Sequence, residues 1–343
     1  MVRLVAIAGV TALVWVTSAP NGSTVPPING RIAFGMKSDL FTIGPAGRRL
    51  SRLTSGPGFD DEPAWSPNGR WLAFSRTPPR SKVSSVYVVG ERGGPPRLLA
   101  RGARSPSWSP TGRRLAVLRT SGRGVLTVAL SGGKPKLISA TARSADWSRS
   151  GREIAVMAPD GIGIVDVASG SVRHVTDLTG AFLDWSPDDS TFVFVAESSV
   201  ITVSAVDGSA RTLARVSPPA PGDGPSCAGS VGPAKWSPDG LLIAYEARRC
   251  VDGRYIVSEI PIVNPEGVWQ HQVDNLWWGF APDYGFSDFV WSPDSRLFAF
   301  IDDALLTDNE VYLETAPTYP CNCVYKRLKA GTRGSLSWQR VPK

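Results

Sequence analysis

The sequence predicts an all-β protein, a seven-bladed β-propeller whose blades are four-stranded antiparallel sheets. Three observations lead to this prediction. The 343 residues include 35 glycines and 29 prolines, more than the roughly 12% that these two residues contribute to an average protein. A tryptophan-containing motif repeats along most of the chain. Short apolar runs of strand length lie between the repeated turns, which favours strands over helices.

The repeat consists of a tryptophan, a Ser-Pro turn and an apolar triplet. It is written AWSPNGRWLAF around Trp65 and KWSPDGLLIAY around Trp236. Neighbouring copies are 38 to 55 residues apart, which is about the length of one propeller blade. The tryptophans of the seven copies are Trp65, Trp108, Trp147, Trp185, Trp236, Trp291 and Trp338.

Each copy predicts four strands. The residues that end at the tryptophan form the first strand. In the turn that follows, Pro presets φ, Asp or Asn bonds its own backbone, and Gly accepts a positive φ. In the copy at Trp65 we expect the second strand at Leu72–Phe74, the third at Ser85–Val89 and the fourth at Arg97–Ala100. One blade alone would leave two apolar faces in water, so blades must stack until a ring closes.

The two ends of the chain predict how the ring closes. The first unit begins at Gly30–Phe34 without a tryptophan strand before it, whereas Ser335–Trp338 is a tryptophan strand with nothing after it. Together they complete one blade, so we expect the C-terminal strand to pair with the first strand of a propeller over residues 28–343. Closure removes the open sheet edge that would otherwise promote aggregation.

Residues 1–27 are predicted to be a signal peptide and a short linker. A basic start at Met1–Arg3 precedes the apolar run Leu4–Val16, and small or polar residues follow. This layout is typical of an export signal, and the run is short for a membrane span. We therefore expect a secreted, periplasmic or envelope-associated protein. Retention of the uncleaved segment as a membrane tether stays open, because Pro20 follows the best cleavage residue, Ala19.

The repeat resembles that of a known family. The WSPDG turn that follows Lys235 and the apolar triplet Leu72–Phe74 are similar to the repeat of TolB-like β-propellers, which also occurs in prolyl oligopeptidase-like enzymes. The resemblance covers about residues 30–340. It implies a propeller and carries no catalytic residue across, because the motif residues are structural. The chain departs from TolB in having seven units where TolB has six, and we expect no separate N-terminal α/β domain.

The motif residues themselves are predicted to be structural. One tryptophan per blade, always just before a turn, favours packing between blades over ligand stacking. The turn carboxylates Asp188, Asp239 and Asp294 favour capping of their own turns over metal binding. Function is therefore expected in the loops, because variable loops on a rigid scaffold usually carry binding sites.

An aromatic loop is the first candidate for ligand contact. The stretch Asp274–Asp288 belongs to the face opposite the Ser-Pro turns, which we name the top face. Aromatic rings supply rigid contact area and stack on sugars, bases or peptide side chains. Two interpretations stay open: the loop covers the blade ends or plugs the channel, or it binds a ligand. Its aromatic residues are Trp277, Trp278, Phe280, Tyr284 and Phe286.

The channel mouth on the same face is the second candidate. The residue four positions before each tryptophan is expected near the top of the innermost strand, which places Asp61, Arg104 and Arg143 near one another. Two neighbouring arginines beside an aspartate can hold a carboxylate or phosphate with paired N–H donors. The alternative is a solvated rim with surface ion pairs.

Enzymatic chemistry has weaker support. The two histidines, His174 and His271, fall in predicted outer strands, and no Gly-x-Ser-x-Gly elbow for a serine hydrolase is present. Carboxylates at the channel mouth, from Asp60, Asp61 and Glu62, would suit a polysaccharide hydrolase or lyase. Opposite them we expect four acidic residues whose spacing fits no calcium loop, namely Asp302, Asp303, Asp308 and Glu310.

Four cysteines allow three pairings. Cys227 lies in a top loop that enters a blade, and Cys250 lies in the top loop between that blade's second and third strands, so we predict a Cys227–Cys250 disulfide. This bond is consistent with export into an oxidising compartment. Cys321 and Cys323 are expected at the opposite face, where a strained ring, free thiols or a soft metal all stay open.

The sequence thus predicts an exported, non-enzymatic propeller that binds a protein, peptide or glycan on its top face, with no cofactor and no metal. The alternatives are a polysaccharide-acting hydrolase or lyase, and a scaffold of an envelope complex similar to TolB. Charged residues make up 20% of the chain, the net charge is +7, and no dense basic run marks a nucleic-acid surface. We expect a monomer that binds no nucleic acid.

Overall fold

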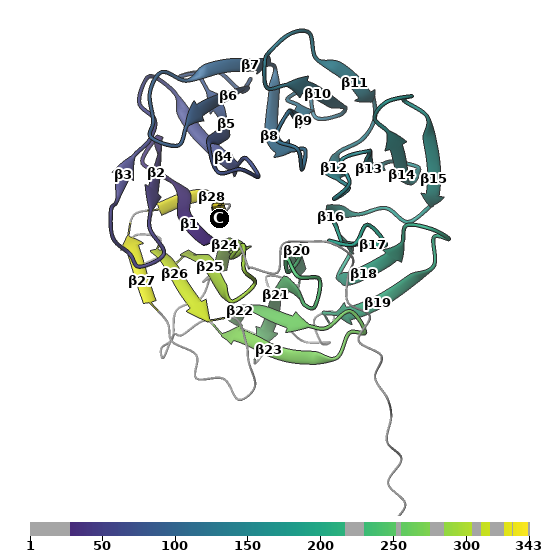
Figure 1. The fold of residues 1–343 in the computed structure, drawn as a ribbon. Coiled ribbons are helices and arrows are strands. Elements are labelled where there is room, and N and C mark those ends of the chain that lie inside the picture. Colours follow the sequence, from purple (N-terminus) through teal and green to yellow (C-terminus); the bar gives the residue numbers. More distant parts are fainter. Residues whose placement is uncertain are drawn as a thin grey trace, which may run out of the picture.

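The computed structural model describes residues 28–216, 230–251, 255–274, 285–303, 310–315, 326–330 and 332–341. All the regular secondary structure in these ranges is β-strand, and Figure 1 shows the strands arranged as a ring of sheets. The predicted signal peptide and linker, residues 1–27, lie outside the described residues. Within the described ranges there is no helix of the length and apolarity needed to cross a membrane.

The described strands form seven four-stranded antiparallel sheets. Six sheets are each built from four consecutive strands, and the seventh joins the last strand of the chain to the first three. An all-β propeller of four-stranded antiparallel blades is therefore confirmed. The innermost strands are β4 (Phe59–Trp65), β8 (Ala103–Trp108), β12 (Ser144–Trp147), β16 (Ala181–Trp185), β20 (Ser230–Trp236), β24 (Gly285–Trp291) and β28 (Thr332–Val341).

The other strands follow outward in each sheet. The second strands are β1 (Ile28–Met36), β5 (Trp71–Thr77), β9 (Arg114–Arg119), β13 (Glu153–Ala158), β17 (Thr191–Ala196), β21 (Ile243–Val251) and β25 (Leu297–Asp303). The third strands are β2 (Asp39–Ile43), β6 (Ser85–Gly90), β10 (Val125–Ala129), β14 (Gly161–Asp166), β18 (Ser199–Ser204), β22 (Tyr255–Val263) and β26 (Glu310–Thr315). The outer strands are β3 (Ser51–Arg52), β7 (Arg97–Arg101), β11 (Lys136–Ser139), β15 (Val172–Thr176), β19 (Ala210–Arg215), β23 (Trp269–Asp274) and β27 (Lys326–Ala330).

The C-terminal strand pairs with the first strand, as the sequence predicts. In the antiparallel register of β1 and β28, Ile32 lies opposite Trp338. The closing strand also reaches the next sheet, where the side-chain Nε2 of Gln339 donates a buried hydrogen bond of 2.6 Å to the carbonyl oxygen of Gly69. The indole Nε1 of Trp338 donates to the carbonyl oxygen of Gly30 at 3.2 Å. The two ends of the chain are thus joined through backbone and side-chain contacts.

The apolar core is divided among the junctions between neighbouring sheets. Buried residues of the described ranges form one cluster at each of the seven junctions. At the junction of the first two sheets, for example, Ala33 and Leu40 pack with Trp65 and Phe74. Each of the seven repeat tryptophans belongs to one of these clusters. The prediction that the tryptophans pack between blades is therefore confirmed.

The Ser-Pro turns have the geometry that their residues predict. The Oγ of Ser66 donates to Oδ1 of Asn68 at 2.8 Å, and the same oxygen accepts the N–H of Arg70 at 3.1 Å. Gly69 has a φ of +68°, which glycine adopts without steric cost. The aspartates at the position of Asn68 make the same pair of contacts, so their predicted capping role is confirmed for Asp188, Asp239 and Asp294.

Candidate functional site

Four innermost strands, β4, β8, β16 and β20, break their register at the same position. In each strand the β-bulge includes the residue three before the tryptophan. In β4, β8 and β16 these residues are Glu62, Ser105 and Phe182, with φ values of +52°, +50° and +59°. Non-glycine residues seldom adopt this left-handed conformation, and bulges often re-aim a side chain next to a functional site. All three residues line one cavity.

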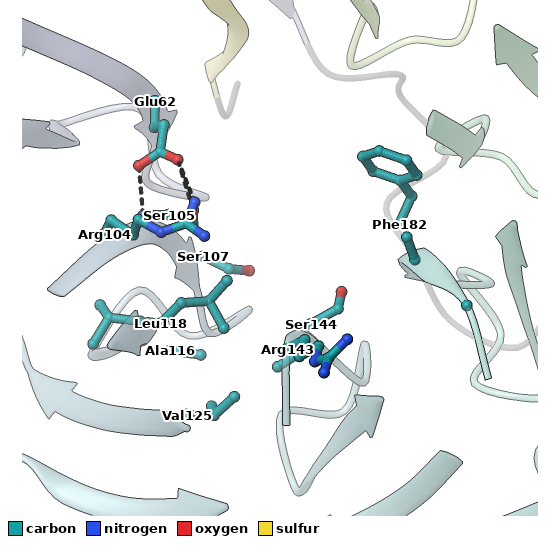
Figure 2. Close-up of a pocket in the computed structure, with 14 residues that line it drawn as sticks. Glu62, Arg104, Ser105, Ser107, Ala116, Leu118, Val125, Arg143, Ser144 and Phe182 are labelled. Carbon is teal, nitrogen blue, oxygen red and sulfur yellow. Dashed lines mark hydrogen bonds and ion pairs between the residues drawn. The ribbon is translucent and has the colours of Figure 1, made fainter. Parts of the chain in front are cut away.

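This cavity, which we name the upper cavity, lies at the end of the innermost strands that is remote from the Ser-Pro turns. Its volume is about 560 Å³, and its lining comes from four neighbouring sheets. Figure 2 shows Arg104 and Glu62 on one side and Phe182 across from them, with Arg143 and Ser144 between. The upper cavity is therefore a recess that carries two arginines and a glutamate on a largely apolar lining, with Phe182 as its aromatic wall.

The two predicted arginines meet in the upper cavity. Nη1 of Arg104 lies 3.5 Å from Oε1 of Glu62, and the Arg104 side chain is half-exposed. Arg143 is exposed and has no ion-pair partner among the residues that the structure describes. The upper cavity therefore offers the N–H donors of two arginines, a residue type that binds carboxylate and phosphate.

Asp61, the third predicted member, contacts the closing strand instead. Its Oδ1 accepts the backbone N–H of Glu62 at 2.7 Å and that of Ser335 at 3.1 Å, and Asp61 does not line the upper cavity. Burial raises the pKa of Asp61, and these two hydrogen bonds oppose the shift. Glu62 therefore takes the acidic place next to Arg104. Its position at the bulge is the signal that distinguishes it.

Phe182 is a site residue that the sequence analysis missed. Its ring is 48% exposed, although Phe is a residue type that proteins usually bury. Phe182 is also the one aromatic residue among the lining residues of the upper cavity. A phenylalanine three residues before a repeat tryptophan, on an innermost strand, was the available signal.

The carboxylates that were considered for hydrolysis have structural partners. Asp60 is 1% exposed, and its two oxygens accept from Nε and Nη2 of Arg76 at 2.5 and 2.6 Å. Glu62 accepts from Oγ of Ser75 at 2.6 Å and from the backbone N and Oγ of Ser105 at 2.7 Å each. These carboxylates join neighbouring strands and blades, whereas glycoside hydrolysis needs two carboxyl groups that flank an open substrate site.

A second cavity, the lower cavity, lies at the end of the channel that carries the Ser-Pro turns and measures about 340 Å³. Asp146 and Asp184, each directly before a repeat tryptophan, line it. Asp146 accepts the N–H of Trp185 at 2.9 Å, and Asp184 accepts the N–H of Trp236 at 2.7 Å. Burial raises the pKa of Asp146 to about 6 and that of Asp184 to about 8, and the charge of Asp146 adds to the second shift.

Some predicted residues lie outside the described residues. They include most of the aromatic loop and, at least in their side chains, the cysteines of the predicted disulfide. The loop contact and the disulfide therefore stay predictions. The residues are Trp277, Trp278, Phe280, Tyr284, Cys227, Cys321, Cys323 and Asp308, together with the side chains of Phe286, Cys250, Asp302, Asp303 and Glu310. In the part of the chain that is described, no group of three His, Cys, Asp or Glu residues is arranged to hold a metal ion.

No family model matches the chain. A segment of 51 residues is 39% identical to the Tol-Pal system protein TolB of Nitratidesulfovibrio vulgaris, and it spans 15% of this chain and 12% of that protein. The match is therefore confined to a short part of both proteins, and it agrees with the TolB-like repeat.

Solved structures share the fold. TolB of Acinetobacter baumannii is 13% identical, with a TM-score of 0.52, and the match covers 92% of this chain and 83% of TolB. The periplasmic gluconolactonase of Pseudomonas aeruginosa is 14% identical with a TM-score of 0.62 and coverage of 92% and 100%. An oligogalacturonate lyase in complex with manganese is 13% identical with a TM-score of 0.60 and coverage of 89% and 85%. At these identities the likenesses show a TolB-like propeller fold alone, and function has to be argued from the site.

Proposed function

We propose that this chain is an exported, non-enzymatic, seven-bladed propeller that binds a protein, peptide or glycan on its top face, and that the upper cavity receives an acidic group of that ligand. The observation that carries the proposal is the unpaired guanidinium of Arg143 in the same recess as Arg104, with Phe182 on the far side. An acidic group would be the charge complement of this recess, and the aromatic ring would contact the rest of the ligand.

The pair between Arg104 and Glu62 leaves Arg104 able to turn to a ligand. The separation of 3.5 Å is longer than the 2.7–2.9 Å of a strong charge-assisted hydrogen bond. Glu62 keeps its bonds to Ser75 and Ser105 without Arg104. An incoming carboxylate would therefore compete with a weak partner and would leave no carboxylate unsatisfied.

The backbone of Phe182 supports a role in recognition. A non-glycine residue in the left-handed region costs about 1–2 kcal/mol. The ring at this position is 48% exposed, so burial repays only part of the cost within the protein. Contact with a ligand would bury the remainder of the ring.

Location in the cell envelope is part of the proposal. It is supported by the export-type N-terminus, by the short likeness to a Tol-Pal system protein and by the fold shared with a periplasmic gluconolactonase. The aromatic loop with Trp277 and Trp278 belongs to the same predicted face and would extend the binding surface beyond the cavity.

The test is a screen of the mature chain against arrays of peptides and glycans, followed by affinity measurement for the best ligands. Arg104→Ala combined with Arg143→Ala should weaken binding of acidic ligands at least about tenfold, because two charge-assisted contacts are lost. Arg173→Ala, on the outer strand β15, removes an equivalent exposed charge and should change affinity little. Acidic ligands that bind the double variant as tightly as the parent would refute the role of the upper cavity.

A further inference from the structure

Two arginines replace prolines at a repeated position of the propeller. The residue two after the repeat tryptophan is proline in five copies, including Pro67 and Pro110. In the other two copies it is Arg149 and Arg340. Proline suits this turn position because its fixed φ presets the turn. The departure at Arg149 therefore places a charge where the turn favours an uncharged ring, whereas Arg340 lies within the strand β28, opposite Asn29 of β1.

The ring brings the two arginines to one place. β12, which precedes Arg149, and β28, which contains Arg340, belong to sheets three steps apart in the ring of seven. Figure 1 shows these strands on opposite sides of the ring. Both arginines nevertheless line the lower cavity, together with proline rings of the neighbouring turns. They therefore reach into the same opening from facing blades.

Neither guanidinium has a carboxylate partner among the described residues. Burial lowers the pKa of the Arg149 guanidinium, the positive charge of Arg340 lowers it further, and Asp189 opposes both effects. Asp189 does not pair with the guanidinium, because its carboxylate accepts the backbone N–H groups of Arg149 and Ser150. Two like charges thus face each other, an arrangement that an anion would stabilise.

Asp189 also departs from the repeat. It has a φ of +61°, like the glycines at the same position of other copies, such as Gly151 with +70°. Its carboxylate caps the turn that carries Arg149 from the adjacent blade. The turn that lacks its proline is therefore fixed by a neighbour, which holds Arg149 at the mouth of the lower cavity.

The acidic residues of the lower cavity do not cancel the positive charge of its two arginines. Asp146 and Asp184 accept backbone N–H groups of the next blades, and burial favours their neutral forms. The charged groups that act on this pair are Asp189, which raises the pKa of Asp146, and Lys235, which lowers that of Asp184. Near neutral pH these values leave Asp184 protonated and Asp146 ionised, so the two arginines still outnumber the negative charges among the lining residues of the lower cavity.

We propose that the lower cavity is a second ligand site, which binds an oxyanion, a carboxylate or a phosphate, between the guanidinium groups of Arg149 and Arg340. It shares no lining residue with the upper cavity. The two ends of the channel therefore take separate ligands or separate parts of one long ligand. The proline rings at the mouth provide apolar contact for the group that carries the anion.

Equilibrium binding of two probes, inorganic phosphate and succinate, to the full chain tests this site at low ionic strength. Arg149→Gln with Arg340→Gln keeps side-chain length and removes both charges, so we expect at least about a tenfold loss of affinity for the better probe. Arg173→Gln, on the outer strand β15, makes the same change at an exposed arginine that lines neither cavity and should leave this affinity within about twofold. Tighter binding of phosphate assigns a phosphate ligand, and tighter binding of succinate assigns a carboxylate ligand.

A pH series gives a second readout. Affinity of the parent for succinate, whose carboxyl groups are already ionised at neutral pH, should fall as the pH rises through the pKa of Asp184, because the cavity gains a negative charge. Circular dichroism verifies that the double variant is folded, and the two single variants replace it in the test should it unfold. The proposal is overturned if neither probe binds the parent at about 10 mM. It is equally overturned if the arginine variants bind the better probe as the parent does.

Discussion

Deletion of Ser335–Lys343 opens the ring and should unfold most of the molecule. The deleted segment buries Leu336 and Trp338, which are each 6% exposed, and Gln339, which is 5% exposed. Loss of a buried tryptophan side chain alone costs about 3–5 kcal/mol, and loss of a buried leucine about 2–5 kcal/mol. Together they approach the whole stability of about 5–15 kcal/mol that is typical of a folded protein.

The deletion also leaves buried partners without a hydrogen bond. Oγ of Ser337 accepts the N–H of Trp65 at 3.0 Å, and the N–H of Leu336 donates to Oδ2 of Asp288 at 2.7 Å. Each partner that stays buried and unsatisfied adds about 1–3 kcal/mol to the cost. Since the lost contacts lie on both neighbouring sheets, the effect spreads beyond the closing blade.

Urea unfolding followed by circular dichroism measures the loss, and size-exclusion chromatography detects association through the exposed edge of β1. Trp338→Ala should lower the free energy of unfolding by about 3–5 kcal/mol. Trp269→Ala, at a side chain that is 59% exposed on the outer strand β23, is the matched control and should change it by less than about 1 kcal/mol. A truncated chain that unfolds at the same urea concentration as the parent would refute the closure.

Two further substitutions test the backbone and the charges of the channel. The pKa of Asp184 in the folded protein, about 8, lies above its ordinary value of 3.8, so its contribution to stability is present below about pH 4 and is lost as the pH rises through about 8. Over this range the urea midpoint of the parent should therefore fall relative to that of Asp184→Asn. Parallel pH profiles of the two midpoints would contradict the buried acid. The free energy of unfolding of Phe182→Gly should exceed that of Phe182→Ala by about 1 kcal/mol, because both variants lose the ring and only glycine adopts a φ of +59° without cost. Equal urea midpoints of the two variants would contradict the strained backbone.

The strands could be predicted because their signals are local. A Ser-Pro turn and an apolar triplet specify a hairpin wherever they occur, and the seven copies make each other more certain. The predicted third strand Ser85–Val89 is observed as Ser85–Gly90, and the predicted fourth strand Arg97–Ala100 as Arg97–Arg101. The closing strand could be predicted for the same reason. The first unit lacks a tryptophan strand and the last unit has only a tryptophan strand, so pairing them completes one blade.

The side chains of the upper cavity were harder to predict because a bulge changes which residues face the channel. The rule of counting four residues back from the tryptophan selects Arg104 and Arg143, which line the upper cavity, whereas on β4 it selects Asp61, which does not. The extra residue in the bulge turns Glu62 toward the cavity and leaves the carboxylate of Asp61 in contact with the closing strand. A shift of one residue moves a side chain to the other face of a strand, and no local pattern announces the shift.

The lower cavity shows how a departure from a repeat is interpreted. Within one copy, Arg149 is an ordinary exposed turn residue, and Arg340 follows the last tryptophan near the end of the chain. Only ring closure brings the two together, because they are remote in sequence and come from facing blades. A propeller repeats the same positions around one axis, so residues at equivalent positions of different copies converge there. A charge that departs from the repeat near the axis therefore lies close to residues of other blades, as Arg149 and Arg340 do in the lower cavity. These two arginines are for this reason the strongest support for a second ligand site at the lower end of the channel.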